Sequence, residues 1–289
     1  MITYKNEAEI AKIRAAGRVL FEAMQEVKAA VRPGVSTYDL DQIAEAAIVR
    51  RGGRPSEKGY NGYPGSICAS VDAEVVHGIP LRSTLLREGQ IVSIDCTVEL
   101  DGYQADMART FAVGKIDPSA QLFVDRTREA FYQGIRFAKV GYRIGDISSA
   151  IQSYVESFGY GVVRVLCGHG IGQEMHEDPE VPNFGLAGHG LRLRPGLSAA
   201  MPAALSAAQR SRGAAGVRGQ PLQSLRAGHR AALHRRMRQP HRLPEALTCR
   251  NFQRIKRPFA EHTDTASARE VFRAVRAGEL FAKGCFGCR

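Results

Sequence analysis

The chain has 289 residues, and its 40 Lys and Arg against 29 Asp and Glu give a formal net charge of +11. That excess invites a nucleic-acid interpretation, but it is confined to one part of the chain. Residues 1–196 hold 22 basic and 24 acidic side chains, a net charge of −2, whereas residues 197–289 hold 18 and 5, a net charge of +13. We therefore do not expect nucleic acid to be the partner of the larger, N-terminal part.

Two function classes are excluded by composition. No run of about 18 apolar residues occurs, so we expect no membrane span. The six cysteines are too sparse for a disulfide framework in a chain of this length, which favours the reducing cytoplasm.

The N-terminal part of the chain has the periodicity of two helices. In residues 7–31 apolar side chains recur every three or four positions, and Pro33-Gly34 stops the pattern. Ser36 or Thr37 caps a second expected helix, which Gly52-Gly53 ends.

A second pair of helices is predicted over residues 120–138 and 144–155. An offset of 107 relates the two pairs: it carries Gly34 onto Gly141, Asp39 onto Asp146, Leu40 onto Ile147, Ile48 onto Val155 and Gly52 onto Gly159. This indicates two pseudo-equivalent α/β halves with a site between them, and chance similarity is the alternative.

Two aspartates flank a predicted β-hairpin. Asp95 follows the strand-like run 91–94, and Asp106 lies beyond the turn signal Asp101-Gly102. A hairpin centred near Leu100 and Asp101 places the two carboxylates opposite each other, which is unfavourable unless a divalent cation lies between them. The alternative is a slipped register in which one aspartate faces water.

Three histidines are candidates for the same site. His169 is flanked by glycines in the segment 167–172, after the strand-like run 161–166, and glycine allows the backbone to approach a ligand closely. A lone histidine is more often a core or surface residue, but this setting favours a metal or catalytic role. His77 and His176 are expected to act as proton carriers or oxyanion donors.

Five motifs together resemble the type I bacterial methionine aminopeptidases. In chain order they are His77-Gly-Ile-Pro, Ile94-Asp-Cys-Thr-Val, Ala105-Asp-Met-Ala-Arg-Thr, Cys167-Gly-His-Gly-Ile-Gly and His176-Glu-Asp-Pro. The resemblance covers about residues 1–196. It implies the α/β pita-bread fold, in which two halves with outer helices and antiparallel strands surround a central metal cleft.

The resemblance also implies roles for the site residues. Asp95 would chelate a metal ion, Asp106 would bridge two, and His169 would complete one site. His176 would stabilise the oxyanion, and His77 would contact the scissile amide. The ions would be Mn, Fe, Co or Zn, normally two.

A side-chain pocket for methionine is implied as well. Tyr60, Tyr63 and Cys68 match its walls, and Met175 supplies a flexible apolar side. Asn61 and Glu57 depart from the family, which often has histidine and cysteine there. The match of the 57–68 loop argues against a proline-specific relative of the same fold. The implied enzyme is a cytoplasmic monomer that removes methionine from nascent polypeptides near the ribosome.

The resemblance stops after Gly196, where we place the boundary between an incomplete metallo-aminopeptidase domain (1–196) and a basic tail (197–289). The family would next supply a glutamate ligand, but Pro202 falls at its position. A second glutamate would come from a motif like Glu261-His-Thr, whose spacing here favours chance over ligation. We therefore expect at most one ion and much lower activity, below what can be detected.

The tail has an unusual composition: sixteen arginines, one isoleucine and no tyrosine. We interpret it as largely an out-of-frame translation that is poorly ordered. The alternatives are a basic RNA-binding extension, which would make the chain an inactive relative bound to ribosome or RNA, and half of a zinc site at Cys285 and Cys288. Glu245, Glu270 and Glu279 sit in no ligand motif.

Overall fold

A computed structural model describes residues 1–206 and 279–287, with side chains for residues 1–201. The first half comprises α1 (Glu7–Ala30), α2 (Thr37–Arg50), β1 (Arg54–Pro55), the 3₁₀ turn η1 (Tyr60–Gly62), β2 (Cys68–Val71), β3 (Ile91–Leu100) and β4 (Tyr103–Ala112). The second half comprises α3 (Pro118–Ile135), α4 (Ile144–Ser157), β5 (Gly161–Val162), β6 (Cys167–Gly170), β7 (Glu177–Pro182), β8 (Ser198–Ser206) and β9 (Glu279–Gly287).

Capping residues and a glycine set the ends of the first two helices. The side chain of Asn6 caps α1 in a capping box with Glu9, and Ser36 caps α2 in the same way with Asp39. Beyond α2, Gly52 adopts a left-handed conformation (φ 78°). The predicted bounds of the first two helices are confirmed to within one residue.

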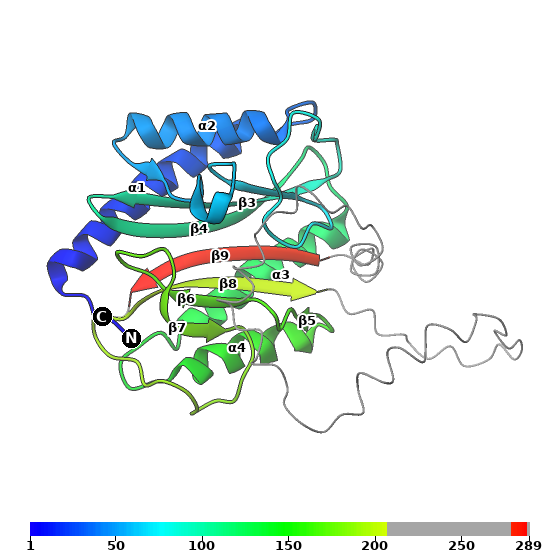
Figure 1. The fold of residues 1–289 in the computed structure, drawn as a ribbon. Helices are drawn as coiled ribbons and strands as arrows, with labels where there is room; N and C mark the ends of the chain where they lie inside the picture. The colour runs from blue at the N-terminus through cyan, green and yellow to red at the C-terminus, as the bar shows by residue number, and fades with distance from the viewer. Residues whose placement is uncertain (207–278, 288–289) are drawn as a thin grey trace, which may run out of the picture.

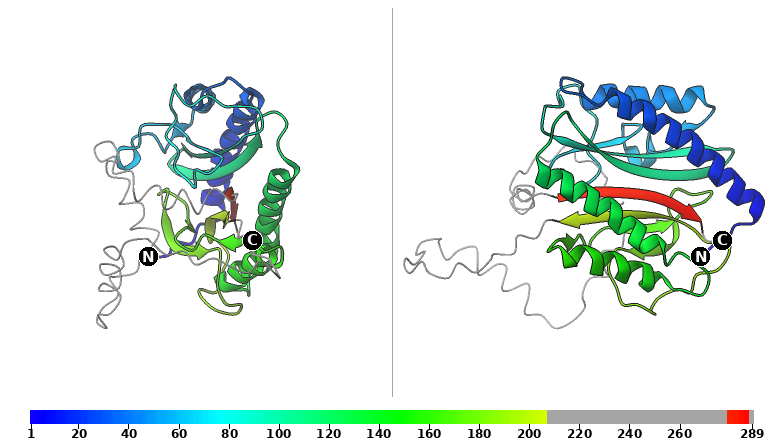
Figure 2. Two further views of the ribbon diagram at one scale, coloured as in Figure 1. Left: turned by 90° about the vertical axis from the view of Figure 1, so that its right-hand side faces the viewer. Right: turned by 180° about the vertical axis from the view of Figure 1, so that it is seen from behind.

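The strands form one curved sheet in the order β1-β3-β4-β9-β8-β6-β7, with β2 paired to β3 and β5 to β8. Helices α1 and α2 lie over the β3–β4 end, and α3 and α4 lie against the β8–β6 end (Figure 1). Seen from behind, α1 and α3 both run diagonally over the rear of the sheet (Figure 2). This is the expected pita-bread arrangement.

Alternation along β3 and β4 gives the sheet two chemically different faces. Ile94, Cys96, Val98 and Ala105 point toward the helices and join the core. The alternate positions, which include Asp95 and Asp106, therefore face the opposite side, here called the inner face. Burial of the apolar face fixes which residues reach the inner one.

The hairpin register corrects one prediction. Asp101 and Gly102 both have positive φ (50° and 78°), so these two residues form the turn and Leu100 pairs with Tyr103. Asp106 therefore lies opposite Thr97, not opposite Asp95. The shift is two residues, and an even shift keeps both carboxylates on one face as diagonal neighbours.

The predicted duplication is visible in the element bounds. An offset of 107 carries α2 onto α4, β1 onto β5 and the start of β3 onto the start of β8. The glycines that close the two helices, Gly52 and Gly159, have nearly the same φ (78° and 83°). Two halves with equivalent helix and strand positions therefore meet at the centre of the sheet.

One strand prediction differs from the structure. The run 161–166 is interrupted by a turn at Arg164 and Val165, where the Arg164 guanidinium stacks on Phe184, so β5 is short and His169 lies within β6. Beyond residue 196, β8 and β9 pair along their whole length although the sequence there shows no alternation. Backbone hydrogen bonding to neighbouring strands does not require alternation of side chains.

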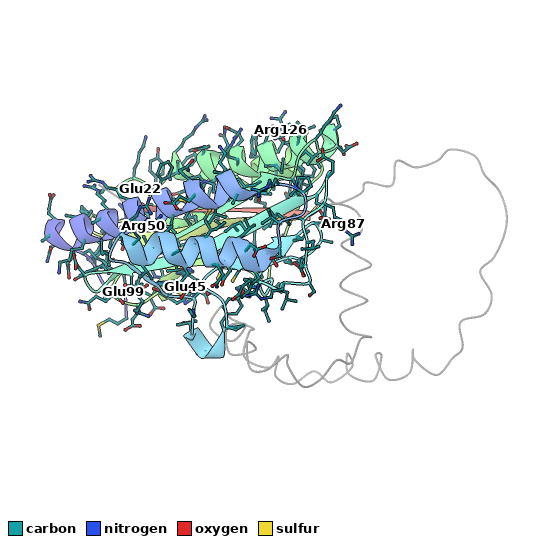
Figure 3. The ribbon with its side chains drawn as sticks, turned by 90° about the horizontal axis from the view of Figure 1, so that it is seen from above. Glu22, Glu45, Arg50, Arg87, Glu99 and Arg126 are labelled. Carbon is teal, nitrogen blue, oxygen red and sulfur yellow. The ribbon has the colours of Figure 1, made fainter. Side chains whose placement is uncertain are left out.

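The outer helices carry the charged surface. Figure 3 shows Glu22 and Arg50 on the neighbouring helices α1 and α2, and ion pairs Arg50–Glu26 and Arg51–Glu22 join these helices. Among the described helices, none combines the length and apolar character needed to cross a membrane.

Candidate active site

Two carboxylates are buried side by side on the inner face. Asp95 of β3 is 8% exposed and Asp106 of β4 is 3% exposed. Their negative charge reaches the Cys96 thiol, whose pKa is raised mainly by burial and further by Glu57, Asp95 and Asp106. Burying two carboxylates together is costly without a compensating positive charge, so this pair is the place where a cation has most to contribute.

His169 comes from the other half of the molecule and meets Asp106. Its Nε2 lies 3.5 Å from Asp106 Oδ2, and its side chain is also buried. Its Nδ1 lies 2.9 Å from the carbonyl oxygen of Gly170. A carbonyl only accepts, so Nδ1 carries the proton, and in the neutral ring Nε2 presents its lone pair toward the carboxylate.

Close packing of two strands requires a glycine at position 170, directly after His169. A Cβ at Gly170 would collide with the carbonyl oxygen of Asp178, where β7 pairs closely with β6. Glycine therefore lets β7 approach and fixes the strand that presents the imidazole.

His176 lies beside His169 and has a different partner. The two ring centroids are 4.3 Å apart, and His176 Nδ1 lies 3.0 Å from the hydroxyl of Tyr60. Burial, with smaller contributions from Glu57 and Glu174, raises the pKa of Tyr60, so the phenol keeps its proton. A phenol that donates to Nδ1 leaves the proton of a neutral ring on Nε2, where it can be donated in turn.

The predicted pocket residues gather next to these groups. Cys68 of β2 pairs directly with Asp95, and Tyr63 is held by hydrogen bonds from its hydroxyl to the carbonyls of Ile67 (3.1 Å) and Gly78 (2.9 Å). Met175 is buried. His77 precedes Gly78 in the loop beside Tyr63 and has a left-handed backbone (φ 60°).

The donors are of the kinds that bind a divalent metal ion. Carboxylate and neutral imidazole suit Mn, Fe, Co or Zn, and the Nδ1 contact of His169 is the outer hydrogen bond that metal-binding histidines use. Within residues 1–206 and 279–287, however, no three His, Cys, Asp or Glu side chains are already gathered closely enough to hold an ion. The described donors are therefore of suitable kinds but are not close enough together to hold an ion.

The second half does not supply equivalent carboxylates at the corresponding positions. The offset of 107 carries Asp95 onto position 202, a proline in this sequence. Strand β9 pairs with β8 as β4 pairs with β3: Lys283 opposes residue 202, as Ala108 opposes Asp95, so residue 281, a phenylalanine, corresponds to Asp106. Neither residue type has a metal-binding oxygen. Glu261 lies outside the described residues.

Sequence reasoning assigned no role to several residues beside the site. Glu57 is buried and accepts a hydrogen bond from the hydroxyl of Thr97, the residue opposite Asp106. Lys5 is buried in an ion pair with Glu177, the residue after His176. The sequence did offer a reason to examine Glu57, because this residue departs from the resembled family. Nothing in the local pattern pairs Lys5 with Glu177, which lies 172 positions away.

An open cavity of about 520 Å³ lies on the helix-covered side of the sheet, between α1, β4 and α3. Its walls include Ile13, Phe21, Met107 and Phe131. Asp106 also contributes to its lining, so the cavity reaches the strand that carries one of the candidate metal ligands.

Comparisons with known proteins agree with this geometry. Residues 11–216 match the model of metallopeptidase family M24. Methionine aminopeptidase from Clostridium acetobutylicum is 51% identical over 197 residues, which cover 68% of this chain and 79% of that protein. The crystal structure of methionine aminopeptidase from Rickettsia prowazekii matches with a TM-score of 0.70 at 37% identity, covering 72% of this chain and 83% of that chain. Prolidase from Pyrococcus furiosus matches with a TM-score of 0.62 at 19% identity, covering 71% and 58%, a likeness of fold alone.

Proposed function

We propose that this chain, which belongs to metallopeptidase family M24 and within it to the methionine aminopeptidases, uses Asp95, Asp106 and His169 to hold a divalent metal ion. Its relatives establish the activity class, metal-dependent removal of N-terminal methionine. The observation that carries the residue assignment is the placement of His169 Nε2 3.5 Å from Asp106, with Nδ1 held by the Gly170 carbonyl.

A divalent ion bound here would lower the pKa of a water molecule and make hydroxide available near neutral pH. His176 is proposed to donate its Nε2 proton to the oxygen that becomes negative during attack on the peptide carbonyl. Tyr60 holds His176 in the tautomer that can donate. His77 is proposed to contact the scissile amide and to help pass a proton to the departing amine.

Tyr60, Tyr63, Cys68 and Met175 are proposed to form the pocket for the methionine side chain. Two of these residues also contact the proposed catalytic and metal-binding residues: the Tyr60 hydroxyl shares a hydrogen bond with His176, and the backbone of Cys68 pairs with that of Asp95. Occupation of the pocket would therefore bring the first peptide bond toward the donors.

The chain as written is proposed to hold at most one ion. In the resembled family two glutamates complete the site, and one of them also shuttles a proton. Position 202 is proline, and we treat Glu261 as no ligand. Loss of these groups predicts activity far below that of a complete enzyme.

The remaining assignments are also proposals. We infer action on nascent polypeptide N-termini in the cytoplasm as a monomer with transient ribosome contact. The second candidate function, a non-catalytic relative that binds ribosome or RNA, is favoured by one observation, the +13 charge of residues 197–289. We also propose that this tail is an out-of-frame translation.

Release of methionine from the peptide Met-Ala-Ser in Mn²⁺ tests the proposed function. We expect the chain to release methionine at a rate near background, Pro202→Glu to raise that rate by restoring a carboxylate opposite Lys283, and Pro202→Glu combined with Asp106→Asn to return it to background. Pro202→Gln is the matched control for the proline removal. A rate typical of complete metallopeptidases from the unaltered chain would contradict the proposal.

A further inference from the structure

The segment that joins the two neighbouring histidines of the site has no regular backbone structure. Residues 171–176, all of which the structure describes, belong to no helix or strand. They lead from β6, which carries His169, to β7, which begins directly after His176. Because no strand ladder fixes the backbone of such a segment, the side chains that pack against it decide where the His176 ring lies.

The carboxylate of Glu177 packs against this segment. Its Oε1 accepts a hydrogen bond from the amide of Glu174 at 3.3 Å, and a Cβ at Gly172 would collide with the same oxygen. The backbone of Glu177 pairs with that of Gly170 across β6 and β7. Glu177 therefore lies next to His176 in the sequence and opposite the residue that follows His169 in the sheet.

Lys5 supplies a positive charge to this carboxylate. Its ammonium group donates to Glu177 Oε2, and its side chain is only 4% exposed. Thr3 joins the pair, because its hydroxyl oxygen accepts from Lys5 Nζ at 2.6 Å and donates to Glu177 Oε2 at 2.5 Å. A Cβ at Gly172 would also collide with Lys5 Cε. The lysine side chain thus contacts both the carboxylate and the glycine segment that follows β6.

The backbone holds Lys5 in place independently of its side chain. The amide of Lys5 donates to the carbonyl oxygen of Gly196 at 2.7 Å, just before β8. Gly196 has a positive φ (84°), and a Cβ there would collide with the Lys5 backbone. Ile2 forms a parallel bridge with Asp178 of β7. Residues 2–5 therefore run between β7 and β8 and present the ammonium group at a fixed place.

Removal of the Lys5 charge would leave Glu177 as a largely buried carboxylate without its cation. Such a carboxylate is unfavourable unless it reaches water. Residues 171–176 can relieve that cost by moving outward, since no strand ladder restrains them. The His176 ring would then move away from its neighbours while both halves of the molecule stay folded.

We propose that Lys5 is a positioning residue of the candidate active site, which acts through Glu177 to hold the His176 ring beside His169 and Tyr60. The centroid of the His176 ring lies 4.3 Å from that of His169 and 5.4 Å from that of Tyr60. The proposal rests on the proposed function, which assigns His176 its task. It makes the N-terminal residues part of the framework of a site whose other residues lie far along the chain.

Nuclear Overhauser effects between ring protons of His176 and those of His169 and Tyr60 measure this placement in the full chain. We would compare the unaltered chain with Lys5→Met, which keeps an unbranched apolar side chain and removes the charge, and with Lys5→Arg, which keeps the charge. We expect the ring-to-ring effects in the unaltered chain, their loss in Lys5→Met and their retention in Lys5→Arg.

A matched variant separates positioning from a general loss of stability. Leu40→Ala truncates a fully buried side chain in the core of the first half, so it destabilises the protein without touching residues 171–176 and should keep the ring-to-ring effects. Thr3→Val removes the hydroxyl that bridges Lys5 and Glu177 and preserves its shape. It should weaken the effects, and it provides the comparison if Lys5→Met does not fold.

The outcomes distinguish this proposal from the proposed function. Ring-to-ring effects that persist in Lys5→Met and Thr3→Val would overturn the role of Lys5 and leave the proposed function intact. Their loss in Lys5→Arg or in Leu40→Ala would also overturn that role, because the placement of His176 would then not depend on the Lys5 charge specifically. Their absence from the unaltered chain would contradict the arrangement of the histidines on which the proposed function depends, and with it the role of Lys5.

Discussion

Neighbouring histidines in this site have different hydrogen-bond partners. His169 donates from Nδ1 to a backbone carbonyl, which leaves the Nε2 lone pair for a metal ion, whereas His176 Nδ1 shares a hydrogen bond with the Tyr60 hydroxyl; where the phenol donates, the proton of the neutral ring is on Nε2. The rings lie 4.3 Å apart, and one hydrogen bond to each decides the difference. The chemistry of each ring therefore depends on a partner that is not itself catalytic.

A buried ion pair beneath His176 gives a pH-dependent prediction. Burial would raise the pKa of Glu177, but hydrogen bonds from Lys5 and Thr3 outweigh that effect and hold its pKa below the usual 4.5. Because the folded-state pKa is depressed, the pair stabilises the protein above the unfolded-state pKa, and this contribution is lost as pH falls through the folded value.

Glu177→Gln should therefore lower the free energy of unfolding by about 3 kcal/mol at neutral pH, since it leaves Lys5 buried without its carboxylate. Urea unfolding at several pH values measures this. The difference from the unaltered chain should be constant above about pH 5 and should shrink below pH 4.5. Asp125→Asn, which breaks the exposed pair with Arg128, should cost under about 1 kcal/mol. A Glu177 effect that grows on acidification would contradict this account.

The sequence motifs singled out Asp95, Asp106 and His169, and the structure brings His169 to 3.5 Å from Asp106; their role as metal ligands stays a prediction. Their relative positions were harder to predict from the sequence. The hairpin was predicted two residues out of register, because the choice between Leu100-Asp101 and Asp101-Gly102 as the turn depends on positive φ at both turn residues. Glu57 received no role, since only the structure places it against Thr97.

At the scale of elements, the two halves are built on equivalent helices. Leu40 of α2 and Ile147 of α4 are related by the offset of 107, and both are fully buried in their own clusters of the core. Their environments are therefore similar in kind although the two clusters share no residue.

Leu40→Ala and Ile147→Ala should each lower the free energy of unfolding by about 2–5 kcal/mol, because each leaves a cavity in a packed cluster. Urea unfolding checks the values, and Val49→Ala on the exposed side of α2 should cost under about 0.5 kcal/mol. If either buried truncation were as mild as the Val49 change, the equivalence of the two helices in the core would be wrong.

Helices were easier to predict than strands for a physical reason. Capping residues and glycines mark helix ends locally, so α1 and α2 were predicted to within one residue. Strands β6, β8 and β9 depend on partners distant in the sequence. The Ala-rich segment Ser198–Ser206 shows no alternation, yet its backbone is paired on both sides, to β6 and β5 on one and to β9 on the other.

At the scale of the whole molecule, the two halves make unequal contributions to the site. The first half supplies both aspartates, and the second supplies His169 and His176. The positions in the second half that correspond to the aspartates hold proline and phenylalanine. Within the described residues, the positions equivalent to Asp95 and Asp106 therefore carry carboxylates in the first half only.

The charge distribution separates the same parts of the chain. The part that carries the site is nearly neutral, at −2, and residues 197–289 carry +13. A strongly basic segment predicts salt-sensitive association with polyanions, which is independent of the inner-face chemistry. The two candidate functions therefore depend on different regions and can be measured separately.

Metal binding tests the central claim most directly. Mn²⁺ would be titrated into the full chain by calorimetry, with Asp106→Ala as the site variant and Asp125→Ala on the surface of α3 as the matched control. We predict at most one weakly bound ion for the unaltered chain and for Asp125→Ala, and none for Asp106→Ala. Tight binding of two ions that is lost in Asp106→Ala would contradict the account, because the chain would then supply ligands beyond Asp95, Asp106 and His169.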